Sequence, residues 1–155
     1  MSAMKTVLLV EDCNDDVFAM KMACKRSGIP HLFQVVTDGE MAMDYLSGEG
    51  EYADRSVYPL PDVVFLDINM PGCTGHDVLG WIRQQPGLKK LPVAMLTGSV
   101  MAEDVNRAYA LGATSYLQKV PEQGEFGQGV RVMLKCWLEL NITATRGESR
   151  RVYLN

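Results

Sequence analysis

Five side chains with the chemistry to bind a metal ion and to accept a phosphoryl group stand at the ends of short apolar runs. Glu11 and Asp12 follow TVLLV, Asp67 follows VVFL, Thr97 follows VAML, and Lys119 comes soon after SYL. A carboxylate that ends a buried run is costly unless a cation or hydrogen bonds hold it. The three carboxylates, the hydroxyl and the ammonium group are therefore candidates for one shared site.

The acidic residues offer hard oxygen ligands with no histidine or thiolate among them, which favours Mg²⁺ in an octahedral shell completed by water. A carboxylate oxygen of Asp67 that is accessible beside such an ion can attack a phosphoryl group, as aspartyl-phosphate enzymes do. The ion and Lys119 would offset charge on the transferring oxygens, and Thr97 would hydrogen-bond the phosphoryl group once it is in place.

Such a site forms only if separate strand ends meet at one edge of a sheet. Apolar runs and helical patterns alternate along the chain, which predicts strands at 6–10, 33–36, 63–66, 93–96 and 115–117, with helices near 14–26, 38–46, 78–83, 105–109 and 126–140. Near-continuous apolar strands between helices are typical of a parallel sheet covered on both faces. We predict an α/β fold with a doubly wound, five-stranded parallel sheet, whose ligand crevice lies outside the carboxyl ends of the strands.

Several local patterns make further predictions. The NDD at 14–16 is an N-cap signal with acids in the first helical turn. The connection at 47–61 is long against the usual length of about 4–6 residues, and is expected to be a surface excursion or, as a second hypothesis, a partner contact. His31 and His76 are expected at the surface. The buried stripe of the last helix is predicted to consist of Phe126, Val130, Met133, Trp137 and Leu140.

Composition indicates one globular domain. The chain has 155 residues, of which 47% are hydrophobic and 22% charged, and we assign residues 1–141 to the domain and 142–155 to a C-terminal tail. A net charge of −4 argues against nucleic-acid binding, and no apolar run is long enough to cross a membrane. The 4 cysteines form no CxxC pair and follow no secretory signal, so we expect reduced thiols and a cytoplasmic location.

Each candidate residue also has a simpler interpretation when it is taken alone. Glu11 and Asp12 could cap the first helix, and Asp67 could be a turn aspartate before the proline–glycine pair. Thr97 could be an ordinary strand-end hydroxyl, and Lys119 a solvated side chain. Four such coincidences at four strand ends are much less expected than one site.

On these residues the chain resembles the response-regulator receiver domains of two-component signalling, over about residues 5–140. The signature is carried in order by VLLVED, VVFLDINMPGCTG, VAMLTGS and SYLQK. The long connection at 47–61 and the closing WLELN helix with its short tail are similar to single-domain receivers partnered with bacterial phytochromes. The resemblance implies a flavodoxin-like receiver fold and a signalling phosphoprotein rather than an enzyme.

The resemblance implies that Asp67 is the phosphoacceptor and that the metal is Mg²⁺. Asp12 would be the direct metal ligand, Glu11 would act more through water, and the main-chain carbonyl of Asn69 would complete the protein ligands. The pair at 11–12 is Glu-Asp where many members have Asp-Asp, which leaves the metal assignment intact.

The resemblance also implies a switch and a set of partners. Lys119 would contact the phosphoryl group, and Thr97 and Tyr116 would reorient after phosphorylation. The partners would be a sensor histidine kinase such as a bacterial phytochrome, and a histidine phosphotransfer protein or another downstream target. A second copy of the chain could bind through the face of the fourth helix, fifth strand and fifth helix.

Two other functions stay open at this point. In most receivers proline follows the lysine directly, whereas here Val120 separates Lys119 from Pro121, which leaves room for an interaction module that works without phosphorylation. A phosphatase with an aspartyl-phosphate intermediate is the other alternative. Phosphatases of the haloacid-dehalogenase type need a second aspartate two residues after the nucleophile, and here Asn69 stands at that position and cannot do acid–base work.

Overall fold

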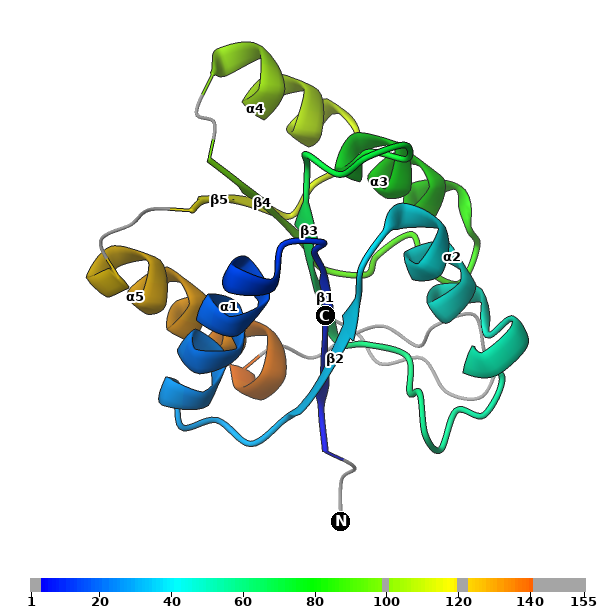
Figure 1. Ribbon diagram of the computed structural model, residues 1–155, viewed down its shortest axis with the longest axis horizontal. Helices are drawn as coiled ribbons and strands as arrows, with labels where there is room; N and C mark the ends of the chain where they lie inside the picture. Colours follow the sequence, from blue (N-terminus) through cyan, green and yellow to red (C-terminus); the bar gives the residue numbers. More distant parts are fainter. Residues whose placement is uncertain (1–3, 99–100, 120–122, 141–155) are drawn as a thin grey trace.

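The computed structural model describes residues 4–98, 101–119 and 123–140, which form a central sheet between helices (Figure 1). The strands are β1 (Thr6–Val10), β2 (Leu32–Val36), β3 (Val63–Asp67), β4 (Val93–Thr97) and β5 (Ser115–Gln118). The helices are α1 (Asn14–Arg26), α2 (Gly39–Ser47), α3 (Gly75–Gln84), α4 (Ala102–Ala110) and α5 (Gln123–Leu134), with a 3-10 helix η1 (Gly50–Tyr52) and a π-helix η2 (Lys135–Leu140). The predicted alternation of strands and helices is confirmed.

All five strands are parallel, in the order β2-β1-β3-β4-β5. Helices α1 and α5 pack together on one face of the sheet, and α2, α3 and α4 cover the other (Figure 1). The predicted doubly wound α/β sheet is therefore confirmed. Because the strand order reverses at β1, a crevice is expected at the carboxyl ends of β1 and β3.

The central strands bury both of their faces. In β1, Val7 and Leu9 belong to the core under α1 and α5, whereas Leu8 and Val10 belong to the core under α2, α3 and α4. All four side chains are fully buried, and β3 and β4 alternate in the same way. Since apolar side chains fill the length of these strands, polar side chains gather at the strand ends.

Two helices on the same side of the sheet begin with side-chain caps. The Asp38 carboxylate accepts a hydrogen bond from the Met41 amide at 2.7 Å and starts α2. Thr74 and Asp77 form a capping box that starts α3. In α1 the acids Asp15 and Asp16 lie in the first turn as predicted, but the predicted N-cap is wrong, because the helix begins directly at Asn14 and its N-cap residue, Cys13, makes no side-chain cap bond.

The last helix departs from the predicted stripe at its end. Val130 and Met133 are buried as expected, but Leu140 is 68% exposed and Leu138 takes the buried position. The reason is the π-helical winding of η2, which has more residues per turn than an α-helix and so changes which side chain faces the core.

The long connection at 47–61 is tied to α2 rather than extended into solvent. The rings of Tyr45, Tyr52 and Tyr58 pack against one another with centroids 5.0–5.9 Å apart. The Arg55 guanidinium donates hydrogen bonds to the carbonyls of Tyr45 and Tyr58, and to that of Leu46 at the C-terminal end of α2. The segment is thus a packed extension of α2.

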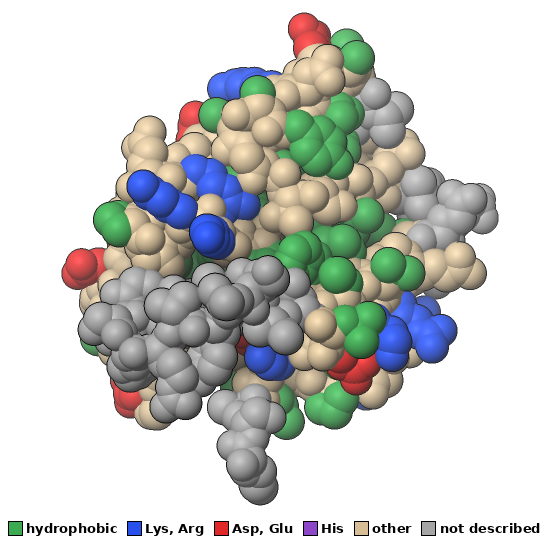
Figure 2. Space-filling view, turned by 180° about the vertical axis from the view of Figure 1, so that it is seen from behind, with side chains coloured by type: hydrophobic (Ala, Val, Ile, Leu, Met, Phe, Trp, Pro, Cys, Tyr) green, Lys and Arg blue, Asp and Glu red, His purple; other side chains and the backbone are tan. Residues whose placement is uncertain are grey.

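Charges of both signs lie on the face drawn in Figure 2, where small acidic and basic groups stand between hydrophobic and neutral surface. None of the described helices has the length and apolarity that crossing a bilayer requires. The tail at 142–155 and the Val120–Pro121 pair lie outside the described residues, so the domain boundary stays a prediction.

Candidate functional site

Four neighbouring strands bring the predicted site residues to one edge of the sheet. Glu11 follows β1, Asp67 ends β3, Thr97 ends β4, and Lys119 follows β5. The backbone amide of Lys119 donates to the Thr97 carbonyl at 2.6 Å, which extends the pairing of β5 with β4 up to the site. The pairing of β1, β3, β4 and β5 thus brings Glu11 and Lys119, which are 108 residues apart in the chain, to the same edge of the sheet.

A tight loop holds Asp67 in place. The amide of Gly75, the first residue of α3, donates to the Ile68 carbonyl at 3.0 Å. A Cβ atom at Gly75 would lie 2.3 Å from the Asp67 carbonyl oxygen and 2.8 Å from Ile68 Cα, so only glycine allows this approach. The PGCTG sequence therefore brings the start of α3 directly under the strand end that carries the carboxylate.

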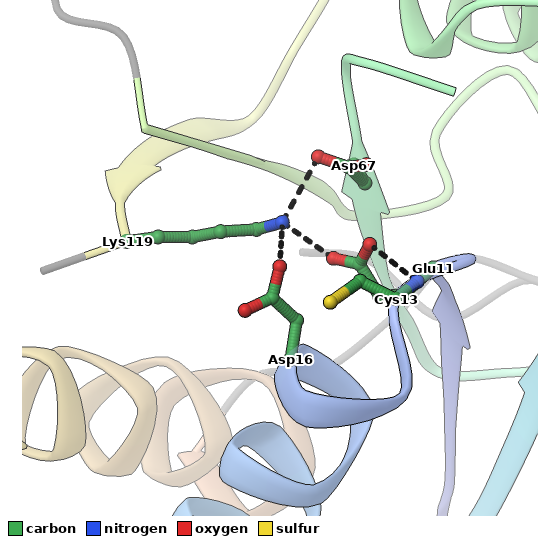
Figure 3. A network of polar contacts seen from close by, with 5 residues as sticks. All are labelled: Glu11, Cys13, Asp16, Asp67 and Lys119. Atoms are coloured by element: carbon green, nitrogen blue, oxygen red, sulfur yellow. Dashed lines mark hydrogen bonds and ion pairs between the residues drawn. The ribbon is translucent and has the colours of Figure 1, made fainter. Parts of the chain in front are cut away.

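Lys119 reaches across the crevice to three carboxylates (Figure 3). Its Nζ atom lies 2.5 Å from Glu11 Oε1, 2.9 Å from Asp16 Oδ2 and 3.1 Å from Asp67 Oδ1. The Glu11 and Asp67 side chains are only 2% and 5% exposed, and that of Lys119 is 21% exposed. The pairs with Glu11 and Asp67 are largely shielded from water, so they interact more strongly than surface pairs do.

The carboxylates of Glu11, Asp12 and Asp67 form a set that fits a divalent cation. Their oxygen atoms all lie within 4.8 Å of one another, and Asp12 is exposed, which leaves one side open to water. Oxygen ligands with room for water suit Mg²⁺. Asn69 lies two residues after Asp67 in the loop before α3, on the same side of the sheet.

Burial and the charges of the site together shift the pKa values of Glu11 and Lys119. Burial raises the pKa of Glu11 from its usual 4.5 to about 7, with Lys119 opposing the rise and the Asp67 charge adding to it. Burial by itself would lower the pKa of Lys119, but its hydrogen bonds to Glu11 and Asp16 and the charge of Asp67 raise it overall. Lys119 is therefore a permanent cation, whereas the Glu11 charge depends on pH near neutrality.

Tyr116 on β5 is connected to Thr97 at the end of β4. Thr97 is 1% exposed, and its side chain shares a hydrogen bond with the half-buried Tyr116. Burial raises the pKa of the Tyr116 phenol, the bond with Thr97 opposes the rise, and the charge of Asp104 on α4 adds to it. The two residues proposed as a switch therefore contact each other, within reach of the α4 charge.

The simpler interpretations of Lys119, Asp67 and the Glu11–Asp12 pair do not hold. Lys119 is not a solvated side chain, because all of its ammonium donors are used on carboxylates. Asp67 is the last residue of β3 and 4% exposed, so it is not a turn aspartate. Neither Glu11 nor Asp12 is the N-cap of α1, although Glu11 Oε2 accepts from the Cys13 amide at 3.3 Å.

Sequence reasoning missed the contact of Asp16 and placed His76 wrongly. Asp16 was assigned only to the acidic first turn of α1, yet it contacts Lys119; its spacing of five residues from Glu11 carries no general signal. His76 was expected at the surface but is 4% exposed, because α3 already starts at Gly75 and its first turn packs into the molecule. Within the part of the chain that the structure describes, His76 Nε2 has no hydrogen-bond partner.

A groove runs beside the site between α1 and α5. It has a volume of about 880 Å³, and Asp16 and Lys119 lie among its lining residues. Phe18, which is 65% exposed, Met22 and Phe126 give it an apolar lining. A partner that occupies this groove would therefore touch the edge of the carboxylate site.

Comparison with known proteins agrees with the fold and gives the family. Residues 7–131 match the family model described as the response regulator receiver domain. The response regulator Rcp1 of Synechocystis sp. is 36% identical over 135 residues, which cover 87% of this chain and 90% of Rcp1. The crystal structure of the phosphorylated cyanobacterial phytochrome response regulator RcpA has a TM-score of 0.82 at 35% identity and covers 90% of this chain and 98% of RcpA. The crystal structure of the Mn²⁺-bound form of Rcp1 has a TM-score of 0.78 at 36% identity and covers 89% of this chain and 97% of Rcp1.

Proposed function

The chain belongs to the response regulator receiver domain family, and from this premise we propose that Asp67 accepts a phosphoryl group from a sensor histidine kinase in a Mg²⁺-dependent reaction. The observation that carries the proposal is the position of Asp67. It is a buried strand-end carboxylate that lies 3.1 Å from the Lys119 ammonium and within 4.8 Å of two further carboxylates.

The transfer is a displacement at phosphorus. One Asp67 carboxylate oxygen attacks the phosphorus of the donor's phosphohistidine and forms an O–P bond. The N–P bond to the imidazole breaks, and its electron pair stays on the imidazole nitrogen, which then takes up a proton. Lys119 would hydrogen-bond a phosphoryl oxygen and offset the negative charge that collects there.

Glu11, Asp12 and Asp67 are the side chains that would hold Mg²⁺, together with the main-chain carbonyl of Asn69. The ion would supply positive charge for the phosphoryl oxygens. The Mn²⁺-bound form of Rcp1 supports a divalent cation in this family, and the all-oxygen donor set of this chain favours Mg²⁺.

Phosphorylation would be read out through Thr97 and Tyr116. A phosphoryl group on Asp67 gives the Thr97 hydroxyl a strong acceptor, so Thr97 exchanges its bond with Tyr116 for one with the phosphoryl group. Tyr116 is then released to reorient, and the face made by α4, β5 and α5 changes its affinity for a target or for a second copy of the chain.

The partner we propose is a histidine kinase of the bacterial phytochrome type, in line with the phytochrome response regulator RcpA. The groove between α1 and α5 is the docking surface we infer for it, because its apolar lining suits a helical partner and Lys119 lies at its edge. Phe18→Ala should slow phosphoryl transfer from the kinase and leave phosphorylation by acetyl phosphate unchanged. Equal rates for Phe18→Ala and wild type with the kinase would contradict this docking surface.

The function is tested by intact-mass spectrometry after incubation with Mg²⁺ and acetyl phosphate. We expect one added phosphoryl group on wild type and on Asp44→Asn, an exposed acid on α2, and none on Asp67→Asn. An adduct on Asp67→Asn equal to that of wild type would contradict the proposal. Absence of both the adduct and Mg²⁺ binding in wild type would favour an interaction module that works without phosphorylation.

A further inference from the structure

We propose that Asp16 is a positioning residue that holds the Lys119 side chain toward the phosphoryl-accepting carboxylate. The proposal rests on the proposed function, in which Asp67 receives a phosphoryl group. It concerns a residue of the first turn of α1 that is neither the acceptor nor a member of the three-carboxylate set.

The geometry of Lys119 motivates the inference. An ammonium group has three N–H donors, and here each has its own carboxylate, from Glu11, Asp16 and Asp67. Three acceptors from different segments fix the direction of all three N–H bonds (Figure 3). A long lysine side chain otherwise has many rotamers of similar energy, so this arrangement removes most of its freedom before the reaction.

Asp16 differs from the other two acceptors in its location. Glu11 and Asp67 lie within the set of carboxylates that fits a cation, whereas Asp16 lies outside that set among the described residues. Its side chain is 41% exposed at the edge of the groove between α1 and α5, against 2% for Glu11 and 5% for Asp67. When the oxygens of Glu11 and Asp67 are engaged by the cation and the phosphoryl group, Asp16 is the acceptor that continues to hold Lys119.

Asp16 also connects Lys119 to the opposite side of the crevice. Lys119 follows β5, and the hydrogen bond from its amide to the Thr97 carbonyl fixes only its backbone. Asp16 comes from α1, which follows β1, so the ammonium group is anchored from the far side of the site. Its position is then set by packed elements at both ends of the side chain.

The experiment compares Asp16→Asn, Asp16→Glu and Asp15→Asn with wild type. Asp15→Asn is the matched control, because Asp15 is an exposed acid in the same helical turn without a contact to Lys119 in the structure. We expect Asp16→Asn to lower the rate of phosphorylation by acetyl phosphate at saturating Mg²⁺ roughly threefold to tenfold. Asp16→Glu should restore most of the rate, and Asp15→Asn should stay within about twofold of wild type.

A second measurement requires neither Mg²⁺ nor phosphorylation. The rate at which an acylating reagent modifies Lys119 is followed by peptide mass spectrometry in metal-free buffer. Asp16→Asn should raise this rate, because loss of the Asp16 carboxylate makes Lys119 easier to deprotonate and its neutral amine easier to reach. Wild-type rates of both phosphorylation and acylation in Asp16→Asn, or no recovery in Asp16→Glu, would overturn the proposal. If wild type itself is not phosphorylated, the proposed function fails, and the acylation rate still decides whether Asp16 anchors Lys119.

Discussion

Glu11→Gln should make the metal-free protein more stable at neutral and alkaline pH. Glu11 is nearly fully buried beside Asp67, and burial raises its pKa to about 7. Between pH 4.5 and about 7 the folded state keeps a proton on Glu11 that the unfolded chain has lost. The free energy of unfolding of wild type therefore falls as the pH rises through this window. Above about pH 7 the full cost of burying the ionised Glu11 carboxylate is present.

A pKa rise of this size corresponds to roughly 3 kcal/mol of destabilisation once Glu11 is ionised. Glutamine has the same shape, carries no charge, and keeps a carbonyl oxygen that can accept from Lys119. The free energy of unfolding of Glu11→Gln should therefore exceed that of wild type by about 1–3 kcal/mol at pH 8 and differ little from it at pH 5. For a urea slope of about 2 kcal/mol per molar, the unfolding midpoint should rise by about 0.5–1.5 M at pH 8.

The assay is urea unfolding in EDTA at pH 5, 6, 7 and 8, followed by tryptophan fluorescence for wild type and Glu11→Gln. Saturating Mg²⁺ is the control, because a cation bound to the ionised carboxylates should stabilise wild type more than the variant. A stability difference that is the same at all four pH values, or that is larger at pH 5 than at pH 8, would refute the reasoning.

Three further predictions concern the packing around and beyond the site, and two of them have a matched control substitution. Gly75→Ala should lower the free energy of unfolding in urea by about 1–3 kcal/mol and slow phosphorylation, because its Cβ would lie 2.3 Å from the Asp67 carbonyl oxygen. The control Gly80→Ala, whose Cβ would have its nearest atom at 3.8 Å, should leave the stability unchanged or raise it. Equal losses of stability in the two variants would show that the loop has room for a Cβ at Gly75. In the same urea measurement, Leu138→Ala should lower the free energy of unfolding by about 2–4 kcal/mol and Leu140→Ala by less than about 0.5 kcal/mol. The reverse order would contradict the π-helical winding of η2. Arg55→Ala should lower the free energy of unfolding by about 1–3 kcal/mol, because three carbonyls each lose a hydrogen bond from the guanidinium group. An altered phosphorylation rate of this variant with acetyl phosphate would show that the 47–61 segment acts on the site.

The sheet and the edge that carries the site could be predicted from the sequence, because the signals are local. Runs such as VLLV and VVFL are apolar on both faces, and their alternation with helical patterns is typical of a doubly covered parallel sheet. In such a sheet the strand ends share one edge, so Glu11, Asp67, Thr97 and Lys119 had to lie near one another. The structure brings all four to that edge.

Other features depend on contacts that no local pattern contains. Asp16 meets Lys119 only because the fold brings the first turn of α1 within reach of the residue that follows β5, more than 100 residues away in the chain. Leu138 replaces Leu140 in the core because η2 winds as a π-helix, which a period of 3.6 residues cannot anticipate. His76 is buried because α3 starts earlier than its apolar positions indicate.

The location of the phosphoryl group is the most direct test of the central claim. After incubation with acetyl phosphate and Mg²⁺, borohydride reduces an aspartyl phosphate to homoserine, which peptide mass spectrometry assigns to a sequence position. We expect this conversion at Asp67 and at no other acidic residue. Homoserine at Asp12 or Asp16 in place of Asp67, the longer amino alcohol that a reduced glutamyl phosphate would give at Glu11, or phosphorylation that borohydride does not reduce, would contradict the assignment of Asp67 as the phosphoacceptor.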